Sequence, residues 1–313
     1  MMDWSTPHQR FFLRQITRRT LLYTEMVTAN ALIHGDPEKL LWHSPEEYPL
    51  ALQLGGNEPE SLAKACQIAK HFDWYEINLN LGCPSDRVQS GAFGASMMAD
   101  PIRVKECLSA MIESGVRVGA KIRIGIDDQD PDETLLPFVD SIAGLGLKTL
   151  TVHARKAILK GLSPKQNREI PPLDYQQAIR IKEAFEHLQV ILNGGLTDLA
   201  KDHAWVGPLD GVMYGRHAYH SPWEMAQADP LYFGQAAPHA TPDQALRACY
   251  PYLEKQLSQG MYLGHFTRHI LGLYQGVTGA KQFRRTLSEN AHRPDSGIHT
   301  IEAALSHVLQ ENT

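Results

Sequence analysis

The sequence predicts an α/β protein: an eightfold βα (TIM) barrel followed by a small all-helical domain. Short apolar runs alternate with amphipathic helical stretches, which is typical of parallel βαβ units. Polar residues end most of these runs, and strand-like alternation stops near Pro238. A chain of 313 residues has room for one large domain and a small one. We therefore expect the barrel over residues 1–237 and the helical domain over residues 238–313.

Composition narrows the class of protein further. The hydrophobic fraction is 43% and the charged fraction 21%, which excludes a disordered chain. No apolar run approaches the roughly 18 residues of a membrane span, so no membrane partner is expected. The four cysteines show no CxxC pairing, which indicates neither a metal site nor disulfides and fits a reducing cytoplasm. The net charge of −5 argues against a globally basic nucleic-acid binder but leaves room for a local basic face.

Seven apolar runs are the expected strands. They lie at residues 21–27, 49–54, 75–80, 119–124, 149–153, 190–193 and 211–215. A helix over about residues 7–19 precedes the first of them. Because an eightfold barrel needs a strand before that helix, we expect the first barrel strand to be missing or truncated at the N-terminus. The rival fold, a doubly wound open sheet, lacks its Gly-rich G-x-G-x-x-G turn here.

Helix boundaries follow from capping residues. Asn57 is a candidate cap for a helix over 58–72, and Pro101 stands where a first-turn proline belongs in a helix that Gly115 ends. Asp132 and Thr197 are candidate starts for two more helices. In the tail we expect four helical segments, over residues 241–260, 265–275, 281–289 and 298–310.

Polar side chains recur at the C-terminal ends of successive strands. They are Gln53, Asn78, Asn80, Lys121, Arg123, His153 and Asn193. Any one of them alone could simply face outward. Their repetition at one end predicts a ligand-filled barrel mouth, because enzymes of this architecture build their sites there.

Glycines follow the last two expected strands, in Asn193-Gly194-Gly195 and Gly215-Arg216. Glycines allow backbone amides to close around an anion, and an arginine can neutralise it. Most Gly-Gly turns are only tight turns. The pairing with Gly-Arg, at the place where barrels often hold phosphate, predicts a phosphate-bearing ligand.

Cys83 lies between Gly82 and Pro84, directly after a strand. The other three cysteines fall in helical stretches and are expected to be buried small hydrophobes. A thiol in a rigid loop at the barrel mouth can give or take a proton.

Basic residues gather in two places. Residues 155–168 contain five basic residues and no acidic one, and Lys281, Arg284 and Arg285 form a second cluster in the tail. Such runs are usually only solvated faces. Two of them flanking one cavity suit a large polyanion that bridges barrel and tail.

The chain resembles the tRNA-dihydrouridine synthases, most closely the bacterial A-type enzymes. The resemblance runs from end to end and rests on long segments, above all EINLNLGCPSDRVQSGAFGA (76–95) and SPKQNREIPPLDY (163–175). Shorter matches are ALQLGG (51–56), KIRIGIDDQD (121–130), NGGL (193–196) and DGVMYGR (210–216).

The resemblance implies an FMN-binding barrel and a helical domain that grips tRNA. It implies reduction of a D-loop uridine (the 20/20a position) to dihydrouridine, with NADPH as the reductant. The N5 atom of FMNH2 would give hydride to uracil C6, and Cys83 would protonate C5. Flipping the target base out of its stack costs about a few kcal/mol of free energy, and the cost is smaller when the base lies in a loop. We expect a cytoplasmic monomer.

Carried over by motif, the resemblance also implies the site residues. The FMN-binding set would be Met1, Gln53, Lys121, His153, Asn193, Gly194, Gly195, Gly215 and Arg216. The tRNA-binding set would be Asn80, Lys165, Arg168, Lys281 and Arg284. Lys121 would stabilise the anionic reduced flavin near its N1–O2 edge, since a buried cation needs an anion beside it.

Two other readings stay open. An FMN barrel that reduces a small pyrimidine, as dihydroorotate dehydrogenases do, explains the flavin set but not the basic tail. An RNA-binding or RNA-folding protein with incidental catalysis explains the tail but not Cys83.

Overall fold

The structure is a computed structural model of the chain, and it describes residues 1–309. The chain divides into two compact units. One comprises residues 21–214, and the other combines residues 1–20 with the chain from Gly215 onward.

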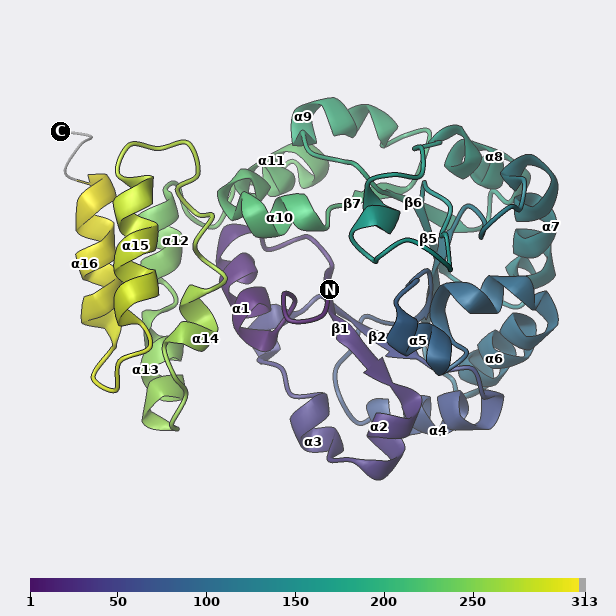
Figure 1. The fold of residues 1–313 in the computed structure, drawn as a ribbon, viewed down its shortest axis with the longest axis horizontal. Coiled ribbons are helices and arrows are strands. Elements are labelled where there is room, and N and C mark those ends of the chain that lie inside the picture. The colour runs from purple at the N-terminus through teal and green to yellow at the C-terminus, as the bar shows by residue number, and fades with distance from the viewer. Residues whose placement is uncertain (310–313) are drawn as a thin grey trace. The chain divides into compact units, whose positions relative to one another are not determined.

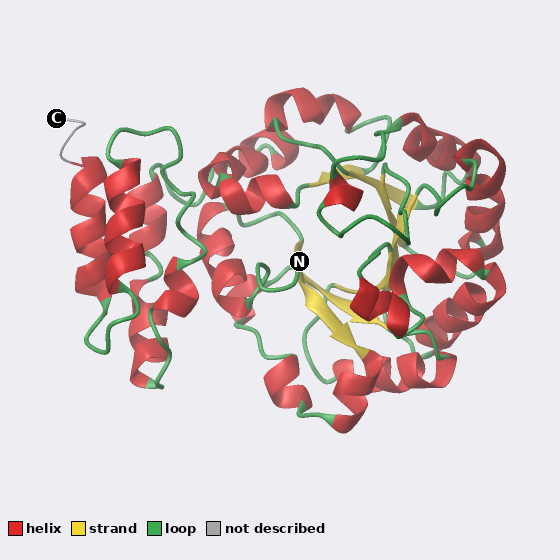
Figure 2. Ribbon diagram, in the orientation of Figure 1, coloured by secondary structure: helices red, strands yellow, loops and turns green. Residues whose placement is uncertain are grey.

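The unit of residues 21–214 is built on one parallel sheet (Figure 2). Each strand pairs with the next one along the chain, in the order β1-β2-β3-β4-β5-β6-β7, and the strands curl into a half-barrel. Within residues 1–309 no eighth strand joins this sheet. The seven expected strands are thereby confirmed. They are β1 (Leu22–Thr28), β2 (Leu50–Gly55), β3 (Glu76–Leu81), β4 (Val118–Arg123), β5 (Thr149–His153), β6 (Gln189–Asn193) and β7 (Gly211–Met213).

Helices cover the outer face of this sheet (Figure 1). Alternate strand residues such as Leu79, Ile122 and Val152 are fully buried in one apolar cluster with helix residues such as Leu108 and Ile142. The hydrophobic core therefore lies between sheet and helices. The helices of this unit are α2 (Ala29–His34), α3 (Pro37–Leu40), α4 (Pro59–Ala69), α5 (Asp86–Ser90), α6 (Pro101–Glu113), α7 (Pro131–Ala143), α8 (Gln176–Ala184) and α9 (Leu199–Asp202).

On the opposite face of the sheet, β3 is polar along its whole length, not only at its C-terminal end. Glu76 opens β3 on this face, and its side chain is fully buried. The Asn78 amide donates to Glu76 Oε1 over 3.1 Å, and burial raises the pKa of the Glu76 carboxyl. Gly119 on the neighbouring strand leaves room for this carboxyl, because a β-carbon there would lie 2.2 Å from Glu76 Oε1.

Three expected helix starts were wrong by one or two residues, and in two cases a neighbouring aspartate is the cap. The helix placed after Asn57 begins at Pro59, whose missing N–H costs nothing in the first turn. Asp130, not Asp132, caps α7, and Asp198, not Thr197, caps α9. A carboxylate accepts amide hydrogen bonds well at a helix N-terminus, which favours both aspartates.

The second unit is all-helical. The Phe11 ring of α1 stacks on Tyr252 of α13 with centroids 3.9 Å apart, and Phe12 meets Phe266 of α14 edge-on. The first helix thus packs with α13 and α14, far along the chain, although the division at residue 237/238 stays a prediction. The helices are α1 (Pro7–Ile16), α10 (Arg216–His220), α11 (Ala228–Phe233), α12 (Pro242–Arg247), α13 (Tyr250–Ser258), α14 (Gly264–Thr267), α15 (Ala280–Asn290) and α16 (Ile298–Leu309).

The tail helices are shorter than expected. The helix predicted over 241–260 is two helices, because Pro251 has no N–H to donate to the carbonyl of Arg247. Only α14 is helical in the segment predicted over 265–275, and turns follow it. The last two helices match closely, except that Gln310 lies outside the described residues. Among residues 1–309 no helix has the length and apolarity that crossing a membrane requires.

Candidate active site

Predicted site residues meet at the C-terminal ends of the strands in the unit of residues 21–214. The strand register sets Asn80 beside Lys121 and His153 beside Asn193. The Asn80 amide donates to Gln53 Oε1 over 2.8 Å. Lys121 Nζ donates to Asn193 Oδ1 over 2.8 Å. Five of the predicted residues therefore form one connected polar surface.

Lys121 is a half-buried cation whose hydrogen-bond partner is neutral. Its ammonium bonds the Asn193 amide oxygen, and among the residues described it forms no ion pair with a carboxylate. Desolvation, and after it the nearby Arg123 charge, together lower the pKa of Lys121 to about 7. Because a buried charge needs an opposite charge, this lysine suits an anionic ligand.

Cys83 stands in a loop that is held from several sides. The Asn80 side-chain oxygen accepts hydrogen bonds from the amides of Gly82 and Cys83, at 3.1 and 3.0 Å. The amide of Ala95 donates to the Cys83 carbonyl over 3.0 Å. Gly94 has φ +72°, and a β-carbon there would lie 2.7 Å from the same carbonyl oxygen. The partly exposed thiol is thus fixed in place.

The other cysteines are buried, as the sequence predicted, and burial raises the pKa of each thiol. A thiol with a raised pKa stays protonated and unreactive near neutral pH. Only Cys83, among the four, combines exposure with a place at the strand ends.

The Gly194-Gly195 turn needs its glycines. Their φ angles are +111° and +72°, and a β-carbon on Gly194 would lie 2.5 Å from His153 Cδ2. The Tyr175 hydroxyl donates to the Gly194 carbonyl over 2.7 Å, which fixes the turn. The protein's own packing therefore requires both glycines, because His153 and Leu173 fill the space that side chains there would need.

Met1, Gly215 and Arg216 belong to the other unit. Gly215 precedes α10 and Arg216 is its first residue. A β-carbon on Gly215 would lie 3.7 Å from Met1 Sδ, so these two residues are neighbours. The Met1 amine donates to Ser5 Oγ over 2.6 Å.

The predicted RNA-contacting residues differ in exposure. Asn80 is only 9% exposed, and both ends of its amide are already hydrogen-bonded inside the protein. Lys165 is exposed and Arg168 half-buried around the single turn η3 (Gln166–Arg168). Lys281 and Arg284 are exposed on α15.

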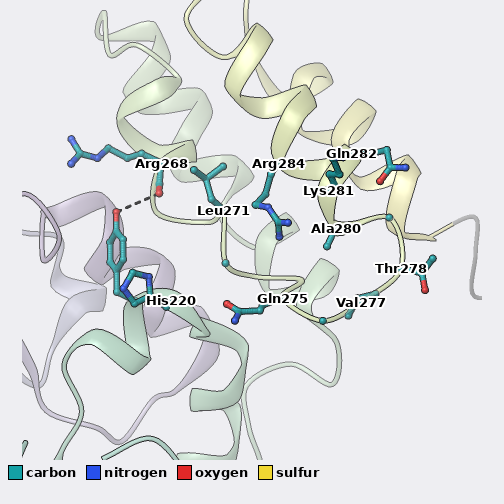
Figure 3. Close-up of a pocket in the computed structure, with 14 residues that line it drawn as sticks. His220, Arg268, Leu271, Gln275, Val277, Thr278, Ala280, Lys281, Gln282 and Arg284 are labelled. Carbon is teal, nitrogen blue, oxygen red and sulfur yellow. Dashed lines mark hydrogen bonds between the residues drawn. The ribbon is translucent and has the colours of Figure 1, made fainter. Parts of the chain in front are cut away.

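A basic groove of about 810 Å³ contains Lys281 and Arg284 (Figure 3). It lies between α10 and the segment from Arg268 to α15, and Tyr219 donates to the Arg268 carbonyl over 3.4 Å across it. No acidic residue is among its fourteen lining residues. In the described part of the chain, neither Lys281 nor Arg284 forms an ion pair. An unneutralised basic surface of this kind favours a polyanion.

Sequence reasoning gave no role to two residues that the geometry singles out. Arg123 was predicted only as one of the polar residues of the barrel mouth, with no role of its own, and its spacing of two from Lys121 was the available signal. Arg268 also lines the groove, where its carbonyl accepts from Tyr219 while its guanidinium donates to the Asp3 carbonyl over 3.0 Å, but no motif marked it.

The fold and the site together define an α/β protein with a partly exposed thiol and a half-buried cation at the C-terminal ends of parallel strands, where barrel enzymes place their chemistry. A family model described as "Dihydrouridine synthase (Dus)" matches residues 1–310. The chain belongs to the dihydrouridine synthase family, which confirms the resemblance seen in the sequence.

Curated relatives match along nearly the whole chain. The tRNA-dihydrouridine(20/20a) synthase of Vibrio parahaemolyticus is 51% identical over 313 residues, covering 99% of this chain and 96% of that protein. The protein of the same name from Escherichia coli K12 is 50% identical, covering 99% of this chain and 90% of that protein. The Vibrio cholerae protein of this name is 49% identical over 310 residues, covering 98% and 94%.

Proposed function

We propose that this protein is a flavin-dependent tRNA-dihydrouridine synthase that reduces a D-loop uridine, at the 20/20a position, to dihydrouridine. The observation that carries the proposal is the joint placement of the fixed Cys83 thiol and the half-buried Lys121 cation, in a chain about 50% identical to synthases of that name over 99% of its length.

The residues present fit FMN as the bound cofactor and NADPH as its reductant. Lys121 is a half-buried cation that lacks an anion, and Gly195 is exposed close to Asn193. We assign Gln53, Lys121 and His153 to the flavin ring. Asn193, Gly194 and Gly195 would hold the phosphate-bearing arm, together with Met1, Gly215 and Arg216. When bound and reduced, the flavin would supply hydride to uracil C6.

Cys83 supplies the matching proton. Saturating the C5–C6 double bond of uracil adds one hydride and one proton, so the thiol gives its proton to C5 and is left as thiolate. Asn80 and Gly94 keep the thiol in one place, which favours a fixed angle of approach to the base. The thiol then recovers a proton from solvent.

Two basic surfaces would bind the tRNA. Lys165 and Arg168 project from the loop of residues 155–168, and Lys281 and Arg284 line the groove of the helical unit. We keep Asn80 as a contact to the target nucleotide. We also propose that the seven strands belong to an eightfold barrel domain (1–237), that residues 238–313 form the tRNA-binding domain, and that the protein works as a monomer in the cytoplasm, where its tRNA substrate is found.

Mass spectrometry of tRNA nucleosides tests the function. Unmodified tRNA incubated with the flavin-loaded protein and NADPH should gain dihydrouridine, and Cys83→Ala should lower the rate by about 10²-fold or more. Cys66→Ala, at a buried cysteine of α4, is the matched control and should keep the activity. Full activity of Cys83→Ala would remove the proton-donor role. Reduction of free uridine as efficient as that of tRNA would favour a small-pyrimidine reductase instead.

A further inference from the structure

Arg123, the last residue of β4, is a buried guanidinium without a carboxylate partner. Arg123 as a whole residue is only 3% exposed. Nε donates to the Gly82 carbonyl over 3.1 Å. Nη1 donates to the carbonyl of Asn167 over 3.0 Å and to that of Lys156 over 3.4 Å. Among the described residues Arg123 forms no ion pair, so backbone carbonyls receive all its hydrogen bonds.

These acceptors lie in the two loops that the proposed function uses. Gly82 immediately precedes Cys83. Lys156 and Asn167 stand near the two ends of the basic loop of residues 155–168, which presents Lys165 and Arg168. The planar guanidinium of Arg123 therefore donates hydrogen bonds both to the loop that carries Cys83 (the thiol loop) and to the basic loop. The single ammonium of a lysine does not reproduce this geometry.

Both loops are otherwise firm, so the Arg123 guanidinium connects two ordered bodies. The Asn167 side chain is fully buried, donates to the Ile158 carbonyl over 2.8 Å and accepts from the Ile158 amide over 2.7 Å. Its amide also donates to the Leu162 carbonyl over 3.2 Å. In the thiol loop, Asn80 fixes the Cys83 amide, as described above. A shift of the basic loop is thus transmitted to Gly82 through Arg123.

We propose that Arg123 is a positioning residue that couples RNA engagement by the basic loop to the placement of the Cys83 thiol. Burying an unpaired cation lowers the stability of the protein, and this link between the two loops gives that burial a function. The inference rests on the proposed function. It assigns to Arg123 no contact with substrate or flavin.

A double-mutant cycle on the flavin-loaded protein tests the coupling. Arg123→Lys keeps the charge beside Lys121 but cannot bridge both loops. We expect reduction of the flavin by NADPH in the absence of tRNA to stay within twofold of wild type. We expect reoxidation of the reduced flavin by saturating tRNA to slow by about 10- to 100-fold, because a misplacement of about 1 Å costs that much.

The second arm of the cycle is Lys165→Ala in the basic loop. In the wild-type background it should slow reoxidation even at saturating tRNA, and in the Arg123→Lys background it should slow it no further. Additive effects, or unchanged reoxidation in Arg123→Lys, would overturn the coupling. If Arg123→Lys fails to fold, Asn167→Ala loosens the basic loop alone and should abolish the effect of Lys165→Ala at saturating tRNA. A wild-type protein that makes no dihydrouridine would instead refute the proposed function.

Discussion

At the scale of single residues, the site is built from charges that are desolvated before any ligand arrives. Lys121 and Arg123 follow each other on one strand face, and they donate hydrogen bonds to an amide oxygen and to backbone carbonyls. Such residues reduce the stability of the free protein, because nothing of opposite charge offsets their desolvation. The free protein is therefore destabilised by the same residues that would bind an anionic ligand.

Lys121→Met should therefore stabilise the flavin-free protein. Burial lowers the pKa of Lys121 to about 7, from an ordinary value near 10.5. Between these two pH values the unfolded chain holds a proton that the folded protein has released, so the free energy of unfolding rises with pH across this window. The substitution should flatten that rise and add on the order of 4 kcal/mol at pH 7 and below.

Urea unfolding of the flavin-free protein at several pH values measures this effect, and the flavin content of purified protein measures its functional side. Lys64→Met, at an exposed position of α4, should change stability by less than about 0.5 kcal/mol. Lower stability of Lys121→Met at pH 7, with normal flavin retention, would contradict the account of Lys121 as an uncompensated cation.

At the scale of elements, the sequence pattern predicted those features that depend on residues close together in the chain. All seven strands follow from apolar runs, because the alternate residues of each strand enter one core with the helices. Cys83 was found because its loop follows a strand directly. The buried Glu76 was not, since its space depends on Gly119 of a neighbouring strand, and the packing of α1 against α13 joins residues far apart in the sequence. Contacts between residues far apart in the sequence produce no periodic pattern from which they could be predicted.

The attachment of α1 predicts how the protein responds to acid. His8 bonds the Tyr252 hydroxyl over 2.7 Å, and His269 bonds the Thr6 hydroxyl over 2.8 Å. Burial is the main cause that lowers the pKa of His8 to about 4 and that of His269 to about 3. Below pH 6.5 the unfolded chain gains protons that the folded protein refuses, so the free energy of unfolding falls as the pH drops.

We expect this loss to reach about 2 to 4 kcal/mol between pH 6.5 and pH 5. Chemical denaturation across that range measures it. The double variant His8→Gln/His269→Gln should show a shallower slope while keeping hydrogen-bonding groups in place. A slope equal to that of the wild type would mean that other groups govern the acid response.

At the scale of the whole molecule, a net charge of −5 coexists with two basic surfaces, one in each unit. The affinity for tRNA should accordingly depend on salt, because each phosphate contact releases a counterion. Lys165→Ala and Arg284→Ala should each reduce the slope of log affinity against log salt by about 0.7 to 0.9, and the double variant by the sum. Binding titrations between about 50 and 300 mM salt give these slopes.

Lys105→Ala, at an exposed site of α6, removes the same charge from the helical outer face and should leave the slope unchanged. The comparison separates a local effect from one of net charge, since all three single variants become more negative by one. If Lys105→Ala reduced the slope as much as Arg284→Ala, the groove would not be the RNA surface, and net charge alone would govern binding. If only Lys165→Ala and Arg284→Ala reduce the slope, the placement of basic residues, and not the net charge, allows this acidic protein to bind a polyanion.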